Sequence, residues 1–108
     1  LSNVTGLYAI KLIFDKFNTF CKIEARFFLS YQNTLSSYIF QNNALKSATE
    51  RVFRYQYEKD HEGSLMHVTH VYQYSSAHLN IQDVQVKKDF IRYKALFPTH
   101  YLTLCNSN

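Results

Sequence analysis

Two histidines three positions apart, His67 and His70, are the residues best suited by type to hold a metal ion. Zinc takes imidazole nitrogens as ligands, usually within a set of four. The residues around this pair alternate in a way that predicts a strand, and positions three apart on a strand point to opposite faces. The pair therefore cannot share one metal ion, and we expect neither a metal nor a cofactor.

The segment His67-Val68-Thr69 resembles the His-x-Thr strand motif of the two-histidine phosphoesterases. The resemblance covers three residues, and it implies an enzyme in which one histidine is the general base and another the general acid. Those enzymes carry two such motifs on adjacent strands. The second candidate here, His100-Tyr101-Leu102-Thr103, has its threonine one residue too far along. A small histidine-dependent hydrolase or phosphoesterase is therefore our third functional hypothesis.

Two cysteines, Cys21 and Cys105, could supply a nucleophilic thiol, a disulfide or two inert apolar side chains. Both lie where apolar and polar residues alternate, and a thiol buried in such a strand is usually unreactive. Their spacing does not decide between a disulfide and free thiols. An intracellular protein is our first expectation. A secreted protein is the alternative that the cysteines and the glycosylation sequon at Asn3 leave open.

Glycine is scarce, with only Gly6 and Gly63 in the chain. Loops that cradle phosphates need glycines so that the backbone can approach the anion, and neither a P-loop nor a dinucleotide motif is present. This excludes nucleotide chemistry by those routes. No run of about 18 apolar residues is present either, so the sequence predicts no membrane span.

A basic stretch late in the chain favours nucleic-acid binding as the alternative function. The net charge is +4, and four cations are expected on or near one helix, namely Lys87, Lys88, Arg92 and Lys94. Tyrosines of the expected sheet could stack on bases. The glycine-bearing aromatic signature of an RNA-recognition motif is missing, however. An RNA or single-stranded DNA partner is therefore the second hypothesis.

The elements that would position these residues follow from hydrophobic periodicity. Residues 7–18 place apolar side chains at helical spacing, which predicts a helix that Thr5 caps. Residues 20–31 alternate between apolar and largely charged positions and predict a strand, with a continuing helix as the rival. A short helix beginning at Asn43 is expected within residues 33–50, whereas Thr34–Phe40 is compatible with a helical turn or an extended strip.

A hairpin is the clearest local signal. Residues 52–59 and 65–74 both alternate and are rich in aromatic and β-branched residues, and a polar turn containing Gly63 separates them. Residues 82–97 predict a helix with Val84, Lys88, Ile91 and Ala95 on one stripe, ended by Pro98. Residues 100–105 are expected to form a short strand.

This order predicts one α+β domain spanning residues 1–108. An N-terminal helix would precede a β-α-β-β-α-β, ferredoxin-like antiparallel sheet. The alternative is a cystatin-like or nuclear-transport-factor-like fold, in which a curved antiparallel sheet wraps a long helix.

The aromatic content favours protein interaction as the first functional hypothesis. Nine tyrosines and nine phenylalanines, 17% of the chain, exceed what a two-layer core of this size easily hides. Tyrosine is enriched at interfaces. We therefore expect a non-enzymatic module that self-associates or binds another protein through an aromatic sheet surface composed of Tyr55, Tyr57, Tyr72 and Tyr74.

Overall fold

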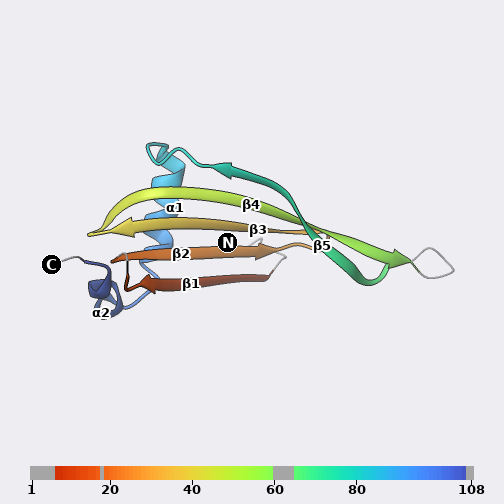
Figure 1. The fold of residues 1–108 in the computed structure, drawn as a ribbon, viewed down its shortest axis with the longest axis horizontal. Coiled ribbons are helices and arrows are strands. Elements are labelled where there is room, and N and C mark those ends of the chain that lie inside the picture. Colours follow the sequence, from red (N-terminus) through yellow and green to blue (C-terminus); the bar gives the residue numbers. More distant parts are fainter. Residues whose placement is uncertain (1–6, 18, 60–64, 107–108) are drawn as a thin grey trace.

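Five antiparallel strands, each hydrogen-bonded to the one before it in the chain, form most of the structure (Figure 1). The computed structural model describes residues 7–17, 19–59 and 65–106. The strands are β1 (Leu7–Asp15), β2 (Phe20–Phe28), β3 (Gln32–Gln41), β4 (Ala44–Lys59) and β5 (Leu65–His78). Three short helical segments follow the sheet: α1 (Val84–Lys94), α2 (Thr99–Leu102) and a 3-10 turn (Thr103–Cys105).

The predicted fold class is wrong. No helix interrupts the five strands in the described residues, so the β-α-β-β-α-β order does not occur. The alternative, a long helix wrapped by the sheet, is not found either. The longest described helix, α1, has 11 residues and follows the sheet in the chain. It crosses one face of the sheet near one end (Figure 1).

The segment expected to be the first helix is strand β1, with residue 18 outside the described part. The apolar residues of this segment satisfy two periods at once. Ile10, Leu12 and Phe14 alternate as a strand requires, and they pair with Ala25, Ile23 and Cys21 of β2. The tertiary pairing with an apolar neighbour therefore decides between the two patterns, because β1 covers one flank of the buried β2 residues.

The helix expected from Asn43 is also absent, because Asn42 and Asn43 form the turn between β3 and β4. Both residues have positive φ, 52° and 65°. A two-residue hairpin loop with positive φ at both positions matches the strand twist, and asparagine tolerates that conformation better than most residues. Residues 33–50 are thus two paired strands, and Thr34–Phe40 is extended.

The strand expected at residues 20–31 and the hairpin of residues 52–74 are confirmed. Strand β2 buries Cys21, Ile23 and Ala25, in the alternation that the sequence indicated. Strands β4 and β5 are longer than expected and pair over most of their length, with three irregularities in register. The hairpin turn with Gly63 lies outside the described residues.

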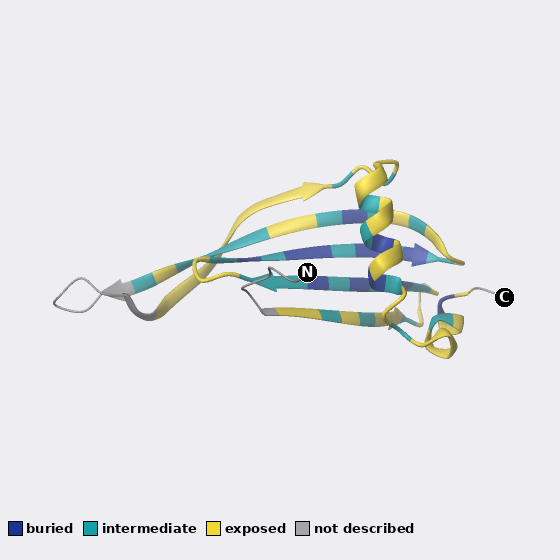
Figure 2. Ribbon diagram, turned by 180° about the vertical axis from the view of Figure 1, so that it is seen from behind, coloured by how far each residue is buried: buried dark blue, intermediate teal, exposed yellow. Residues whose placement is uncertain are grey.

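Helix α1 occupies the expected region, but it buries a different face. Val84 and Ile91 of the expected stripe are 66% and 59% exposed, whereas Phe90 and Tyr93 are buried. The Phe90 ring lies 5.1 Å from that of Phe40 on β3, centre to centre. The helix begins where the Asp83 carboxylate accepts hydrogen bonds from the amides of Gln85 and Val86. Figure 2 shows that the buried sheet residues gather beneath this helix.

The C-terminal segment is helical, so the strand expected at residues 100–105 is wrong. Its end is tied to the sheet by a disulfide between Cys21 and Cys105 and by a backbone hydrogen bond of 3.1 Å from the Asn42 amide to the Cys105 carbonyl. The disulfide holds the two helical segments against the end of the sheet that carries β1 and β2. Neither cysteine is a free thiol.

Candidate functional site

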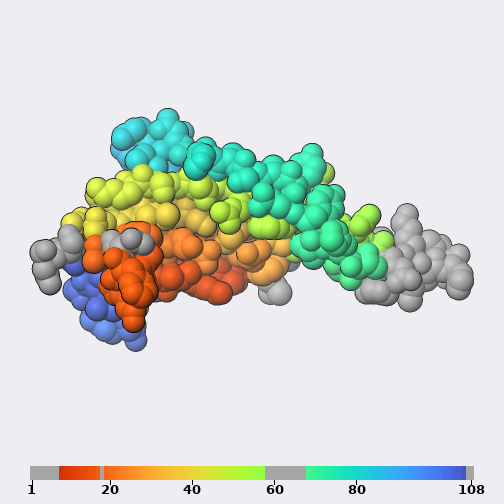
Figure 3. Space-filling model, viewed as in Figure 1, coloured from red at the N-terminus to blue at the C-terminus, as the bar shows by residue number. Residues whose placement is uncertain are grey.

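Strand β5 is an edge of the sheet, and its outer side is not paired with another described strand. It runs along a margin of the molecule, and the β4–β5 hairpin extends beyond the part covered by α1 (Figures 1 and 3). Residues 65–78 contain no Asp, Glu, Lys, Arg or Pro. Charged side chains and proline are the usual protection of an exposed edge strand, so β5 is open to pairing with another chain.

The opposite edge, β1, is shorter and carries charged residues. It has 9 residues against 14 in β5, and it carries Lys11 and Asp15. The C-terminal helical segment lies beside its end, where Leu12 and Phe14 share an apolar hollow with Tyr101. Edge pairing is therefore better supported at β5 than at β1.

The four tyrosines of the expected interaction surface lie on two sides of the hairpin. Tyr55 and Tyr57 share one side, with their rings edge to face at 6.3 Å. The Tyr55 hydroxyl accepts a hydrogen bond of 3.0 Å from the Asn33 amide, and the Tyr57 hydroxyl donates to the backbone carbonyl of Ser30. These two tyrosines are thus bound within the sheet.

Tyr72 and Tyr74 of β5 lie on the other side of the hairpin. Tyr72 pairs with Arg54 and therefore lies on the same face of the hairpin as Arg54. Because neighbouring residues of a strand point to opposite faces, Arg54 and Tyr55 lie on opposite faces. Arg54 lies over the Tyr74 ring, and His70 stacks on Tyr72 at 6.2 Å. Both tyrosines are exposed. The structure therefore does not bring the four tyrosines into one platform.

The basic residues predicted to contact nucleic acid do lie on α1. Lys87, Lys88 and Arg92 are exposed, and Lys94 is half-buried. Arg92 forms an ion pair of 3.1 Å with Asp89, one turn earlier in the helix. Because α1 packs on one face of the sheet and Tyr55 with Tyr57 lies on the other, the helix and these tyrosines do not form a common surface.

The histidines and cysteines within the described residues are not assembled into a metal site. No group of three or more His, Cys, Asp or Glu side chains there is arranged to hold a metal ion. His67 belongs to β5, and the position of its side chain lies outside what the structure describes. His100 is in α2, so the two His-x-Thr-like segments do not sit on adjacent strands.

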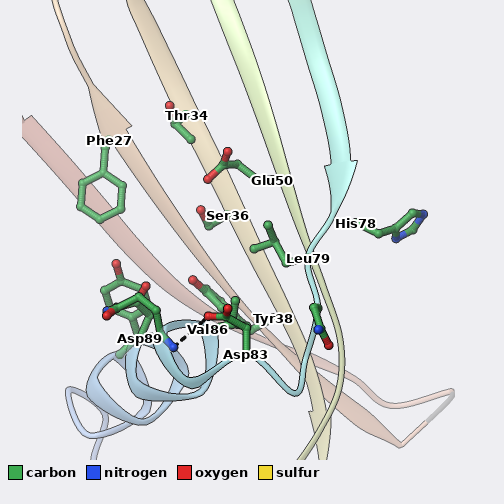
Figure 4. Close-up of a pocket in the computed structure, with 13 residues that line it drawn as sticks. Phe27, Thr34, Ser36, Tyr38, Glu50, His78, Leu79, Asp83, Val86 and Asp89 are labelled. Carbon is green, nitrogen blue, oxygen red and sulfur yellow. Dashed lines mark hydrogen bonds between the residues drawn. The ribbon is translucent and has the colours of Figure 1, made fainter.

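A cleft between α1 and the sheet was not anticipated from the sequence. It has a volume of about 620 Å³ and opens beside the first turns of α1 (Figure 4). Its sheet side includes Thr34, Ser36 and Tyr38 of β3, which all face the helix. Small polar residues on the inward face of a strand leave space where larger ones would fill it. Thr34 and Ser36 therefore indicate a cleft, but only once it is known that they lie on the face of β3 toward α1.

The cleft is lined by both aromatic rings and carboxylates. Tyr38 and Tyr93 are buried, and their rings lie 5.8 Å apart. Burial raises the pKa of the Tyr38 hydroxyl to about 12, and electrostatic interactions with Tyr93, once it ionises, and with Asp89 add to the shift. The hydroxyl therefore remains protonated at neutral pH and is available as a hydrogen-bond donor.

Comparisons with known proteins add no family. No family model matches this chain, and neither a curated protein nor a solved structure is significantly similar to it. None of the helices in the described residues is long and apolar enough to cross a membrane.

Proposed function

We propose that this domain is a non-enzymatic interaction module that self-associates through the edge strand β5. The observation that supports this proposal is an edge of 14 residues that pairs with no further described strand and contains no Asp, Glu, Lys, Arg or Pro. Two copies related by a two-fold axis would align their β5 strands antiparallel and extend each five-stranded sheet into a continuous one. Such an interface uses the same surface patch on both copies.

The exposed side chains of β5 would supply the apolar part of the interface. Val68 and Val71 are 42% and 49% exposed, and Tyr72 and Tyr74 are exposed as well. Backbone hydrogen bonds of a paired edge give affinity, and the side chains beside it give specificity. Tyr55 and Tyr57 of the expected surface would act indirectly, by stiffening β4 beneath β5, because their hydroxyls already bond within the sheet.

The test is the oligomeric state of the purified chain, measured by sedimentation over a range of concentrations. The unmodified chain should form a dimer as its concentration rises. The double variant Val68→Lys/Val71→Lys places charges on the edge and should weaken dimerisation at least about tenfold, since about 1.4 kcal/mol suffices for that change.

A matched control is Val84→Lys/Ile91→Lys, which adds the same charges at two exposed apolar positions of α1. It should leave dimerisation unchanged. Circular dichroism and unfolding curves verify that both variants keep the fold. A monomer at all concentrations, or equal weakening by the two folded variants, would overturn the proposal.

Single-stranded nucleic acid remains the alternative partner, supported by the exposed cations of α1. Binding of a mixed pool of short strands should fall steeply as salt rises, because bound counterions are released. Reversing the charges of Lys87, Lys88 and Arg92 should then abolish binding. Retained binding by that variant would refute the helix as the contact surface.

The disulfide is informative about the cellular compartment in which the protein resides. Disulfides persist in oxidising environments and are rare in reducing ones. A Cys21–Cys105 bond therefore supports the secreted alternative over the intracellular expectation. Thiol labelling of the chain taken directly from its native source, with and without a reductant, tests this.

A further inference from the structure

The cleft between α1 and the sheet has the size of a small-molecule site. Ligand pockets are typically clefts of about 300–1,000 Å³, and this one has about 620 Å³. Its walls come from β2, β3, β4, α1, the last residue of β5 and the segment between β5 and α1. Figure 4 shows side chains from both the sheet and the helix converging on it.

The charge of the side chains that line the cleft favours a ligand of the opposite charge. Three carboxylates line the cleft, those of Glu50, Asp83 and Asp89, together with one histidine, His78, and with no lysine or arginine. The chain as a whole carries a net charge of +4, so the three carboxylates of this lining contrast with the overall charge of the protein. An anion would meet like charge here, whereas a cation would meet the opposite charge.

The three carboxylates are not equally free to meet a ligand. Asp83 caps α1 and is occupied by two backbone amides, which also offsets the positive end of the helix. Asp89 accepts hydrogen bonds from Gln85 and Arg92. No hydrogen bond or ion pair within the described residues involves the carboxylate of Glu50, which leaves Glu50 as the principal counter-charge.

Aromatic rings supply the other part of the recognition surface. Phe27, Tyr38 and Tyr93 line the cleft, and Tyr93 contacts both other rings, at 6.3 and 5.8 Å between centres. A cation is attracted to the face of such rings, and an apolar body gains by contact with them. The hydroxyls of Ser36 and Thr34 add hydrogen-bonding groups on the sheet side.

We propose that this cleft binds a small organic cation, a protonated amine attached to an aromatic or similarly apolar body. Glu50 would pair with the ammonium group, and the apolar body would lie against Phe27, Tyr38 and Tyr93. The cleft lies under α1 and touches β5 only at its last residue, His78, whereas the proposed self-association uses Val68, Val71, Tyr72 and Tyr74 further along the strand.

Calorimetric titration with phenethylamine tests the proposal. Phenethylamine should bind, whereas phenethyl alcohol, which keeps the ring and lacks the charge, should bind at least about tenfold more weakly. Phenylacetate, which reverses the charge, should not bind. Backbone amide shifts in nuclear magnetic resonance spectra should change mainly in residues 34–38 and 83–89.

Glu50→Gln should weaken phenethylamine binding about tenfold without unfolding the domain, because Glu50 is exposed. Glu24→Gln is the matched control. It removes the same charge from β2, where Glu24 forms an ion pair with Lys22 on the face of the sheet opposite to α1. This control should bind phenethylamine normally.

Three outcomes would overturn the proposal: no binding of phenethylamine, equal binding of the uncharged alcohol, or equal weakening by Glu50→Gln and Glu24→Gln. Amide shifts confined to residues 65–74 of β5 or to the C-terminal segment would also contradict it, because they would place the amine outside this cleft.

Discussion

The guanidinium carbon of Arg54 on β4 lies 3.4 Å from the centre of the Tyr74 ring on β5. Tyr74 occupies an irregularity in the pairing, where Val52 and Phe53 of β4 face Ser75 and Gln73 and leave Tyr74 without an opposite residue. The contact therefore links the two strands where their regular pairing is interrupted. The Arg54 Nε atom is buried without a hydrogen-bond partner among the described residues, and the guanidinium lies over the face of the Tyr74 ring.

Replacing Tyr74 by Ala should lower the free energy of unfolding by about 1 kcal/mol, because it removes a cation–π contact from a partly desolvated guanidinium. Chemical denaturation at a concentration where the chain is monomeric measures this change. Tyr74→Phe keeps the ring face and should stay within about 0.5 kcal/mol of the unmodified chain. Equal losses in the two variants would show that the hydroxyl, and not the ring face, is responsible.

The Cys21–Cys105 disulfide closes most of the chain into one loop. Its removal should lower the free energy of unfolding by about 2–5 kcal/mol, since the bond restricts the unfolded chain. Cys21→Ala/Cys105→Ala and the reduced unmodified chain should lose similar amounts in denaturation experiments. A reduced chain as stable as the oxidised one would contradict this account.

Tyr38 should make stability fall at alkaline pH. Its pKa is raised from 10.0 to about 12, chiefly by burial. The unfolded chain therefore loses this proton first as pH rises. The full stability is present below about pH 10, and about 3 kcal/mol is lost between pH 10 and pH 12, at roughly 1.4 kcal/mol for each pH unit.

The measurement is the free energy of unfolding as a function of pH, compared with Tyr38→Phe. The other tyrosines also ionise in this range, so the difference between the two curves isolates Tyr38. The gap between the curves should change by a few kcal/mol across this interval. Parallel curves would show that Tyr38 ionises as readily in the folded protein as in the unfolded chain.

The parts of the fold that the sequence predicted correctly are those in which the strand period fits better than the helical one. Strand β2 and the hairpin of β4 and β5 alternate without a competing helical stripe of equal quality. The residues of β1 fit both periods, and only the apolar neighbour β2 decides between them. The face of α1 was misassigned for a similar reason: Phe90 and Tyr93 were available for burial, but only the position of Phe40 and Tyr38 on β3 selects them.

The candidate sites were predictable to different degrees. The exposed cations of α1 and the tyrosine-rich hairpin follow from local sequence. The division of the tyrosines between two sides depends on strand register, which local sequence leaves undetermined. The cleft could not be predicted, because it joins residues as distant as Phe27 and Tyr93, and its existence depends on how α1 crosses the sheet.

The β3–β4 turn should be sensitive to the backbone preference of residue 43. Asn43 has a φ of 65°, a conformation that glycine adopts freely and that a β-branched residue strongly disfavours. Asn43→Gly should leave the free energy of unfolding within about 1 kcal/mol of the original, whereas Asn43→Val should lower it by about 1–2 kcal/mol. Denaturation curves of the two variants distinguish these cases. Equal stability of the two would mean that residue 43 does not hold a left-handed conformation, and the tight turn between β3 and β4 would then have to be reassigned.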